Sequence, residues 1–97
     1  GMSDGKELFT DEEIIALVRE EDDEGEMSDE DIRKILKRLR AGEVIRVKAP
    51  GEHFEAYFFA HGVFMVRHID GGLVETELPR VCVAGAMHDI FSAEDKW

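Results

Sequence analysis

Residues 53–68 read HFEAYFFAHGVFMVRH, and this stretch decides the fold. Apolar side chains recur at every second position on both sides of the dipeptide His61-Gly62. Such alternation is typical of β-strands, and a two-residue loop that contains glycine is typical of a tight hairpin. The stretch therefore predicts two antiparallel strands, over 52–60 and 63–70.

Two further dipeptides, Pro50-Gly51 and Gly71-Gly72, flank this hairpin along the chain. If each forms a two-residue loop, strands over 43–49 and 73–81 extend the hairpin to a four-stranded meander. We expect one face of this sheet to be the core face on which helices pack. In this register it carries Ile45, Val47, Phe54, Ala56, Phe58, Ala60, Val63, Met65, Ile69, Val74 and Leu78.

Two helix starts precede the predicted sheet. Thr10 stands before an apolar pattern of helical spacing, and Glu13 follows three positions later, which completes a capping box. Ser28 begins a second pattern of this kind, and Ala41-Gly42 ends it as a left-handed cap would. Near the C-terminus, the apolar residues Met87, Ile90 and Phe91 have helical spacing, which predicts a helical turn there.

A chain of 97 residues is long enough for one domain with one modest core. We expect a tag scar at Gly1 with a flexible N-terminus over 1–9, a helical part over 10–42, an antiparallel sheet over 43–83 and a C-terminal segment over 84–97. The predicted fold class is α+β. In it, two amphipathic helices pack on one face of the meander, followed by a short C-terminal helix.

The acidic residues gather at one end of the chain. Residues 1–31 contain 14 acidic and two basic side chains, a net charge of −12, whereas residues 32–97 contain nine acidic and ten basic ones. The total of −11 disfavours nucleic acid and anionic membranes as partners, because binding either one requires a positive surface. A basic protein or a divalent cation fits better. We expect the basic side chains of the second helix to pair with the acidic run.

The sequence also indicates the compartment. Its single cysteine, Cys82, excludes a disulfide within the chain. The N-terminal residues are acidic and polar, unlike a signal peptide, and no apolar run is long enough to span a membrane. These features predict a cytoplasmic protein.

The segment between the two predicted helices, residues 20–31 with the sequence EEDDEGEMSDED, resembles the calcium loop of EF-hands. Gly25 occupies the glycine position of that loop. The resemblance implies a Ca²⁺ or Mg²⁺ site whose ligands are Glu20, Asp22, Glu24, Ser28 and Asp31, and no other cofactor is indicated. At the first position of the loop Glu20 stands in place of the usual aspartate, and at the last position Asp31 stands in place of the usual glutamate. We expect this segment to be a solvated linker between the helices, and the ion site is the alternative.

On the second face of the predicted sheet, one polar row crosses all four strands as Arg46, Glu55, His68 and Glu75. Opposite charges across a strand pair attract by up to ~1 kcal/mol. A histidine between two carboxylates has its protonated form favoured, as in a pH sensor or a general acid, and could also hold a metal. We expect this row simply to stabilise the sheet surface, and a functional site is the alternative.

The same face becomes apolar at Phe59, Phe64 and Val66. We expect the C-terminal helix to cover this patch; otherwise the patch marks an interaction surface such as a dimer contact. The four histidines contain no close-spaced ligand pair that would indicate zinc. Neither a nucleophile motif nor a phosphate-binding glycine loop occurs.

These patterns favour an acidic interaction or regulatory module over an enzyme. The expected partner is a protein with a basic surface, and a second copy of the chain is the alternative partner. A divalent-cation binder that uses residues 20–31 is the alternative function. An enzyme or pH sensor built on the His68 row is the third.

Overall fold

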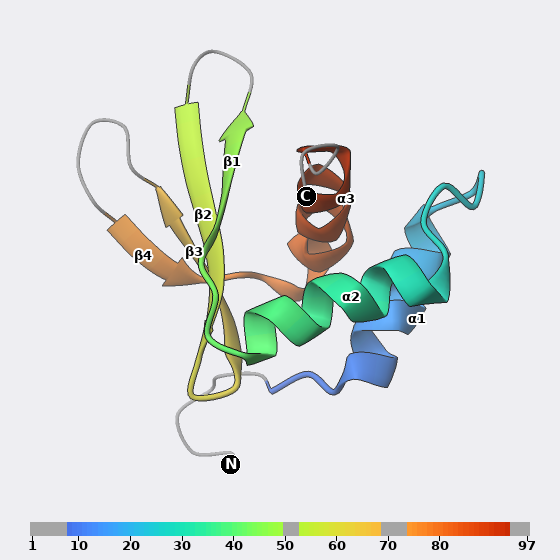
Figure 1. The fold of residues 1–97 in the computed structure, drawn as a ribbon, viewed down its shortest axis with the longest axis horizontal. Helices are drawn as coiled ribbons and strands as arrows, with labels where there is room; N and C mark the ends of the chain where they lie inside the picture. The colour runs from blue at the N-terminus through green and yellow to red at the C-terminus, as the bar shows by residue number, and fades with distance from the viewer. Residues whose placement is uncertain (1–7, 50–52, 69–73, 94–97) are drawn as a thin grey trace.

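The computed structural model describes residues 8–49, 53–68 and 74–93. In this part of the chain, a four-stranded antiparallel sheet carries all of its α-helices on one side (Figure 1). The strands lie in sequence order, so the predicted α+β fold with a meander sheet is confirmed. The elements are α1 (Asp11–Glu21), α2 (Asp29–Arg40), β1 (Ile45–Ala49), β2 (His53–Ala60), β3 (Val63–His68), β4 (Val74–Glu77), the 3-10 turn η1 (Arg80–Cys82) and α3 (Val83–Ala93).

Capping boxes begin the first two helices. The Thr10 hydroxyl accepts from the Glu13 N–H at 3.1 Å, and the Glu13 carboxylate accepts from the Thr10 N–H at 2.8 Å. Ser28 and Asp31 repeat this exchange at the start of α2. Gly42, with φ +99°, follows the end of α2 in the left-handed conformation. The helix starts and the glycine cap predicted from the sequence are confirmed.

Ion pairs join α1 to α2. Arg33 donates to Glu12 at 2.9 Å, and the Arg40 Nε donates to Asp11 at 2.7 Å. Both acids belong to the first turn of α1, where negative charge is also favoured by the helix dipole. Basic side chains of α2 thus pair with the acidic run, as expected.

The central hairpin has the predicted register. His61 and Gly62 both have positive φ, 53° and 81°, as a type I′ turn requires. Ala60 therefore pairs with Val63, and Glu55 pairs with His68.

The two outer strands are shifted by one residue from the predicted register. Arg46 pairs with Ala56 instead of Glu55, and His68 pairs with Val74 instead of Glu75. The connections are longer than two residues, because three positions separate the paired Ala49 and His53, and five separate His68 from Val74. The dipeptides Pro50-Gly51 and Gly71-Gly72 themselves lie outside the described residues.

This shift changes which face of β2 and β3 meets the helices. A one-residue slip moves every side chain of a strand to the opposite face relative to its neighbour. The predicted core face is therefore wrong for these two strands, because Phe58 and Met65 share the face of Arg46, away from the helices. Ala56 and Val63, which were also predicted to be in the core, are nevertheless buried. The sheet residues in the core are Ile45, Val47, Tyr57, Phe64, Val66 and Leu78.

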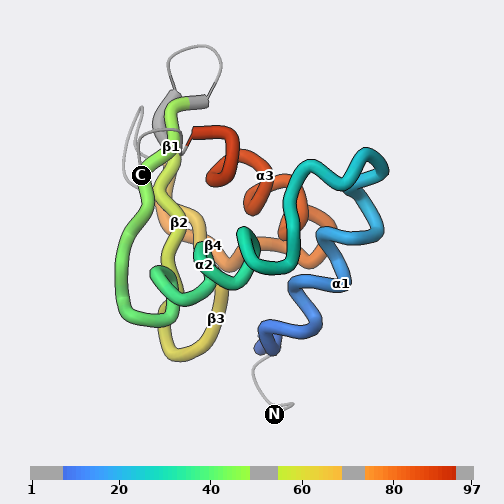
Figure 2. Tube along the Cα trace, turned by 45° about the vertical axis from the view of Figure 1, so that its right-hand side comes forward, coloured from blue at the N-terminus to red at the C-terminus, as the bar shows by residue number. Residues whose placement is uncertain are grey.

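The helices form two layers over this face (Figure 2). α2 and α3 pack against the sheet, and α1 packs on these two helices. Met87 and Ile90 of α3 are fully buried, and Phe64 and Val66 are only 1% and 4% exposed. Phe64 and Val66 therefore belong to the core, and Phe59 is partly buried against it with the Arg40 guanidinium of α2 over its ring, so this patch is not an exposed apolar surface. A dimer that uses another surface stays a prediction. No helix in the described part of the chain is long and apolar enough to cross a membrane.

Candidate functional site: an acidic cleft between the sheet and α3

A cavity of about 520 Å³ opens between the helix-facing side of the sheet and the segment from η1 into α3. The strands β2, β3 and β4 form one wall, and α3 forms the other. This volume is in the range of sites for small ligands or single side chains. The lining residues are Glu55, Tyr57, Val66, His68, Thr76, Leu78, Pro79, Cys82, Gly85, Ala86 and Asp89.

Glu55 is the centre of the polar contacts in this cleft. Glu55 and Tyr57 lie two positions apart on β2, so both side chains point to the helix side. The Tyr57 hydroxyl donates to the Glu55 Oε1 at 2.8 Å. His68, which pairs with Glu55 across β2 and β3, brings its Nδ1 to 3.4 Å from the Glu55 Oε2. This second contact is an ion pair only when the imidazole is protonated.

The surroundings shift two pKa values in the cleft. Burial, and then the hydrogen bond to Glu55, raise the pKa of Tyr57 far above its ordinary value, so the hydroxyl stays a neutral donor. Burial and the nearby Glu55 charge raise the pKa of Asp89, although Asp89 keeps exposed surface. Two carboxylates, Glu55 and Asp89, therefore face one partly desolvated cavity and repel each other.

The cleft combines this negative charge with an apolar wall. Val66, Leu78 and Ala86 are buried around it, whereas Cys82 is exposed. This arrangement of charge and apolar surface is chemically suited to hold a cationic group whose carbon chain lies along apolar residues.

No protein-family model, curated protein or solved structure matches this chain.

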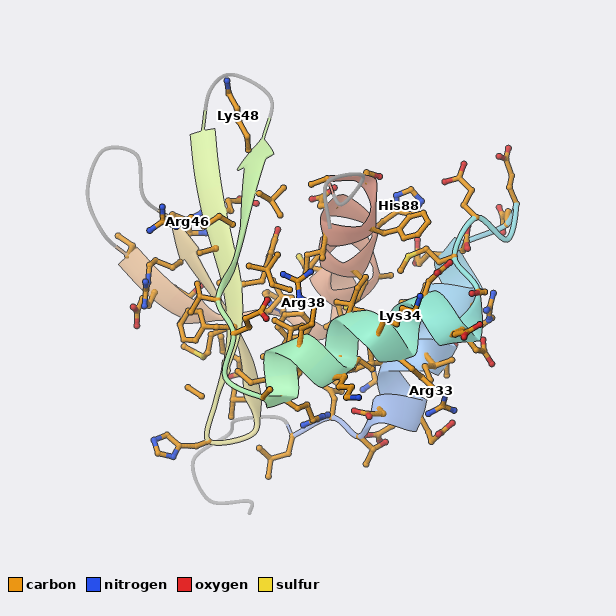
Figure 3. All side chains as sticks on the ribbon, in the orientation of Figure 1. Arg33, Lys34, Arg38, Arg46, Lys48 and His88 are labelled. Atoms are coloured by element: carbon orange, nitrogen blue, oxygen red, sulfur yellow. The ribbon has the colours of Figure 1, made fainter. Side chains whose placement is uncertain are left out.

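The predicted polar row is only half present. Glu55 and His68 do come together, because the central hairpin has the predicted register. Arg46 and Glu75 lie on the other face, where Glu75 accepts from the Arg67 Nε at 2.8 Å. Figure 3 shows Arg46 on the side of the sheet away from the helices. The four-residue row is wrong, since the register of β1 and β4 differs by one residue. Sequence reasoning missed Asp89, which only the packing of α3 brings to the cleft.

The five predicted ligands in residues 20–31 have separate surroundings. Ser28 and Asp31 exchange hydrogen bonds in the capping box of α2. Glu20 belongs to α1, and Glu24 lies in the exposed connection between the helices. The Asp22 carboxylate accepts from the N–H groups of Glu26 and Met27, at 3.1 and 2.9 Å. These backbone bonds, Met27 first, lower the pKa of Asp22.

A second cluster forms where this connection meets α3. Asp22, Glu26 and His88 each bring one potential ligand atom within 4.8 Å of the others. The His88 Nε2 lies 2.8 Å from the Glu26 Oε1, and Figure 3 shows His88 on the side of α3 that faces the connection. Sequence reasoning missed this cluster, because 62 positions separate Glu26 from His88 and no spacing pattern links them.

Proposed function

We propose that this protein is an interaction module that binds a basic side chain of a partner protein in the cleft between the sheet and α3. The observation that carries this proposal is the convergence of Glu55 and Asp89 on one cavity. Its described lining residues include neither lysine nor arginine. A cation from outside would relieve the repulsion between the two carboxylates, and its binding free energy would include that relief.

The chemistry of the cleft favours arginine over a compact cation. A planar guanidinium can donate two hydrogen bonds to a carboxylate such as Glu55, whereas an ammonium acts as a point charge. The carbon stem of the side chain would lie along Val66 and Leu78. The total charge of −11 would attract basic partners over distance and speed their association.

NMR titration tests this function. Uniformly labelled protein is titrated with three acetylated hexapeptides that differ only at the central residue: arginine, lysine or citrulline, the uncharged analogue of arginine. We expect saturable shifts of amide signals in β2 and α3, with the arginine peptide strongest and the citrulline peptide without effect. Free arginine amide and spermidine, added separately, show whether a peptide backbone is needed or any cation suffices.

Variants at the cleft locate the binding. Glu55→Gln and Asp89→Asn keep the shape of each side chain, remove one charge, and should each weaken binding of the arginine peptide about tenfold, equivalent to ~1.4 kcal/mol. Glu30→Gln is the matched control, because Glu30 is an exposed acid of α2 outside the cleft. Equal binding of the citrulline peptide, or unchanged affinity in both cleft variants, would contradict the proposal.

A further inference from the structure

We propose that Asp22, Glu26 and His88 form a binding site for one divalent transition-metal ion, for which Zn²⁺ is the probe of choice. The three side chains come from three places in the fold: the C-cap of α1, the connection to α2, and α3. Their ligand atoms lie within 4.8 Å of one another. A cavity of about 300 Å³ borders the cluster and is lined by Asp22 and His88 among others.

The distances are close to those that coordination requires. Ligand atoms about 2 Å from a tetrahedral ion lie about 3.3 Å apart. The ligand atoms must therefore move closer by at most about 1.5 Å from the spread of 4.8 Å. Glu26 and His88 can move in this way, because their side chains are 50% and 41% exposed. The ion would replace the direct contact between the Glu26 carboxylate and the His88 Nε2.

Asp22 supplies the fixed part of the site. Each of its carboxylate oxygens accepts one backbone N–H, from Glu26 or Met27, and keeps a further lone pair. Such hydrogen bonds hold a ligand in position before the ion arrives, as outer-shell contacts do in established metal sites.

The donor set selects among metals. One imidazole nitrogen with two carboxylates suits Zn²⁺ and its neighbours, whereas Ca²⁺ takes six to eight oxygen ligands. Three protein ligands leave the fourth zinc position for water or another ligand. This site shares only Asp22 with the five residues that the likeness to an EF-hand loop implies. It would tie the connection between α1 and α2 to α3, and so stabilise the folded state.

Calorimetry and spectroscopy test the site on the metal-free full chain. We expect ZnCl₂ to bind with one equivalent and to raise the melting temperature. Co²⁺ should bind at the same site and give visible d–d absorption bands that Zn²⁺ then abolishes by displacement. The variants Glu26→Gln and His88→Ala should each weaken zinc binding at least tenfold. Glu26→Gln keeps the shape of an exposed side chain, so a folded protein is expected.

The controls separate this site from the cleft. Glu24→Gln and His68→Ala change an exposed acid and an exposed histidine outside the cluster, and should bind Zn²⁺ as the wild type does. Absence of zinc binding would overturn the proposal, and so would wild-type affinity in both cluster variants. Loss of binding in His68→Ala or Cys82→Ser would assign the ion to the cleft and overturn it as well. The cleft and metal proposals rest on different residues, so each can fail alone.

Discussion

Tyr57 has two roles at the junction of core and cleft. It is 4% exposed, and its ring meets Phe64 edge-on with centroids 6.2 Å apart. Its hydroxyl nevertheless reaches the cleft and donates to Glu55. The same burial that packs the ring keeps the hydroxyl neutral, so the donor that orients Glu55 persists across the physiological pH range.

This coupling predicts a specific alkaline behaviour. The pKa of Tyr57 is raised above its ordinary value of 10.0 by burial and by Glu55, with smaller contributions from Asp89 and Cys82. The folded protein therefore keeps the Tyr57 proton at a pH where the unfolded chain loses it, and this tyrosine lowers the stability as the pH rises above about 10. We expect Tyr57→Phe to cost about 1 kcal/mol at neutral pH, through the lost hydrogen bond.

Urea unfolding between pH 8 and 11 provides the measurement. The wild-type free energy of unfolding should fall more steeply above pH 10 than that of Tyr57→Phe, because only the wild type can titrate this hydroxyl. Other alkaline groups titrate in both proteins and cancel in the difference. Parallel curves for the two proteins would refute the role given to Tyr57.

Among the elements, the end of α2 is joined to three neighbours through Arg40. Its Nε donates to Asp11 at 2.7 Å and its terminal nitrogen donates to the Phe9 carbonyl at 2.7 Å. The guanidinium also lies 4.5 Å from the centre of the Phe59 ring. One side chain therefore links α2 to the start of α1 and to β2.

Replacing this link should be costly for a residue at the surface. We expect Arg40→Met to lower the free energy of unfolding by about 1–2 kcal/mol, because two charge-assisted hydrogen bonds are lost. Arg33→Met is the control: its partner Glu12 is 74% exposed, and loss of this pair should cost less than about 0.5 kcal/mol. Chemical denaturation of both variants checks the ranking, and equal losses would show that Arg40 acts only as a surface ion pair.

Local chemistry explains which elements could be predicted from the sequence. Thr10 and Ser28 cap their helices by accepting from a backbone N–H three positions away, and His61-Gly62 forms its hairpin turn on its own, so these features follow from short stretches. The face of β2 and β3 that meets the helices could not be predicted in this way. Both faces are apolar there, and the choice depended on β1, whose connection is one residue longer than expected.

The same difference between local and long-range contacts decides which parts of the candidate site could be predicted. The contact between Glu55 and His68 lies within the central hairpin, and its pairing was predictable. Asp89 and His88 reach their neighbours only through the packing of α3. No periodicity or spacing in the sequence predicts such contacts, because they join segments that are distant in sequence.

At the scale of the whole molecule, the uneven charge should make stability depend on salt. Residues 1–31 carry a net charge of −12, and the pair of Arg33 with Glu12, which joins α2 to α1, is largely exposed. Exposed pairs contribute little, so repulsion among the acids should dominate. Screening lengths shorten from about 30 Å at 0.01 M salt to about 10 Å at 0.1 M. We expect the melting temperature to rise over this range.

Differential scanning calorimetry in NaCl measures this effect. A variant with Glu21→Gln and Glu24→Gln, which removes two exposed charges from the acidic end, should show a smaller rise than the wild type. A melting temperature that falls with salt would mean that the ion pairs between helices outweigh the repulsion.

Gly85 and Asp89 each line both cavities, one on either side of the same stretch of α3. A positive charge that enters one cavity therefore raises the electrostatic potential felt in the other. The two proposed occupants, a basic side chain and a metal ion, would then be antagonists. Thermodynamic linkage makes such antagonism symmetrical. If the bound ion lowers the affinity for the partner by a given factor, the bound partner lowers the affinity for the ion by the same factor.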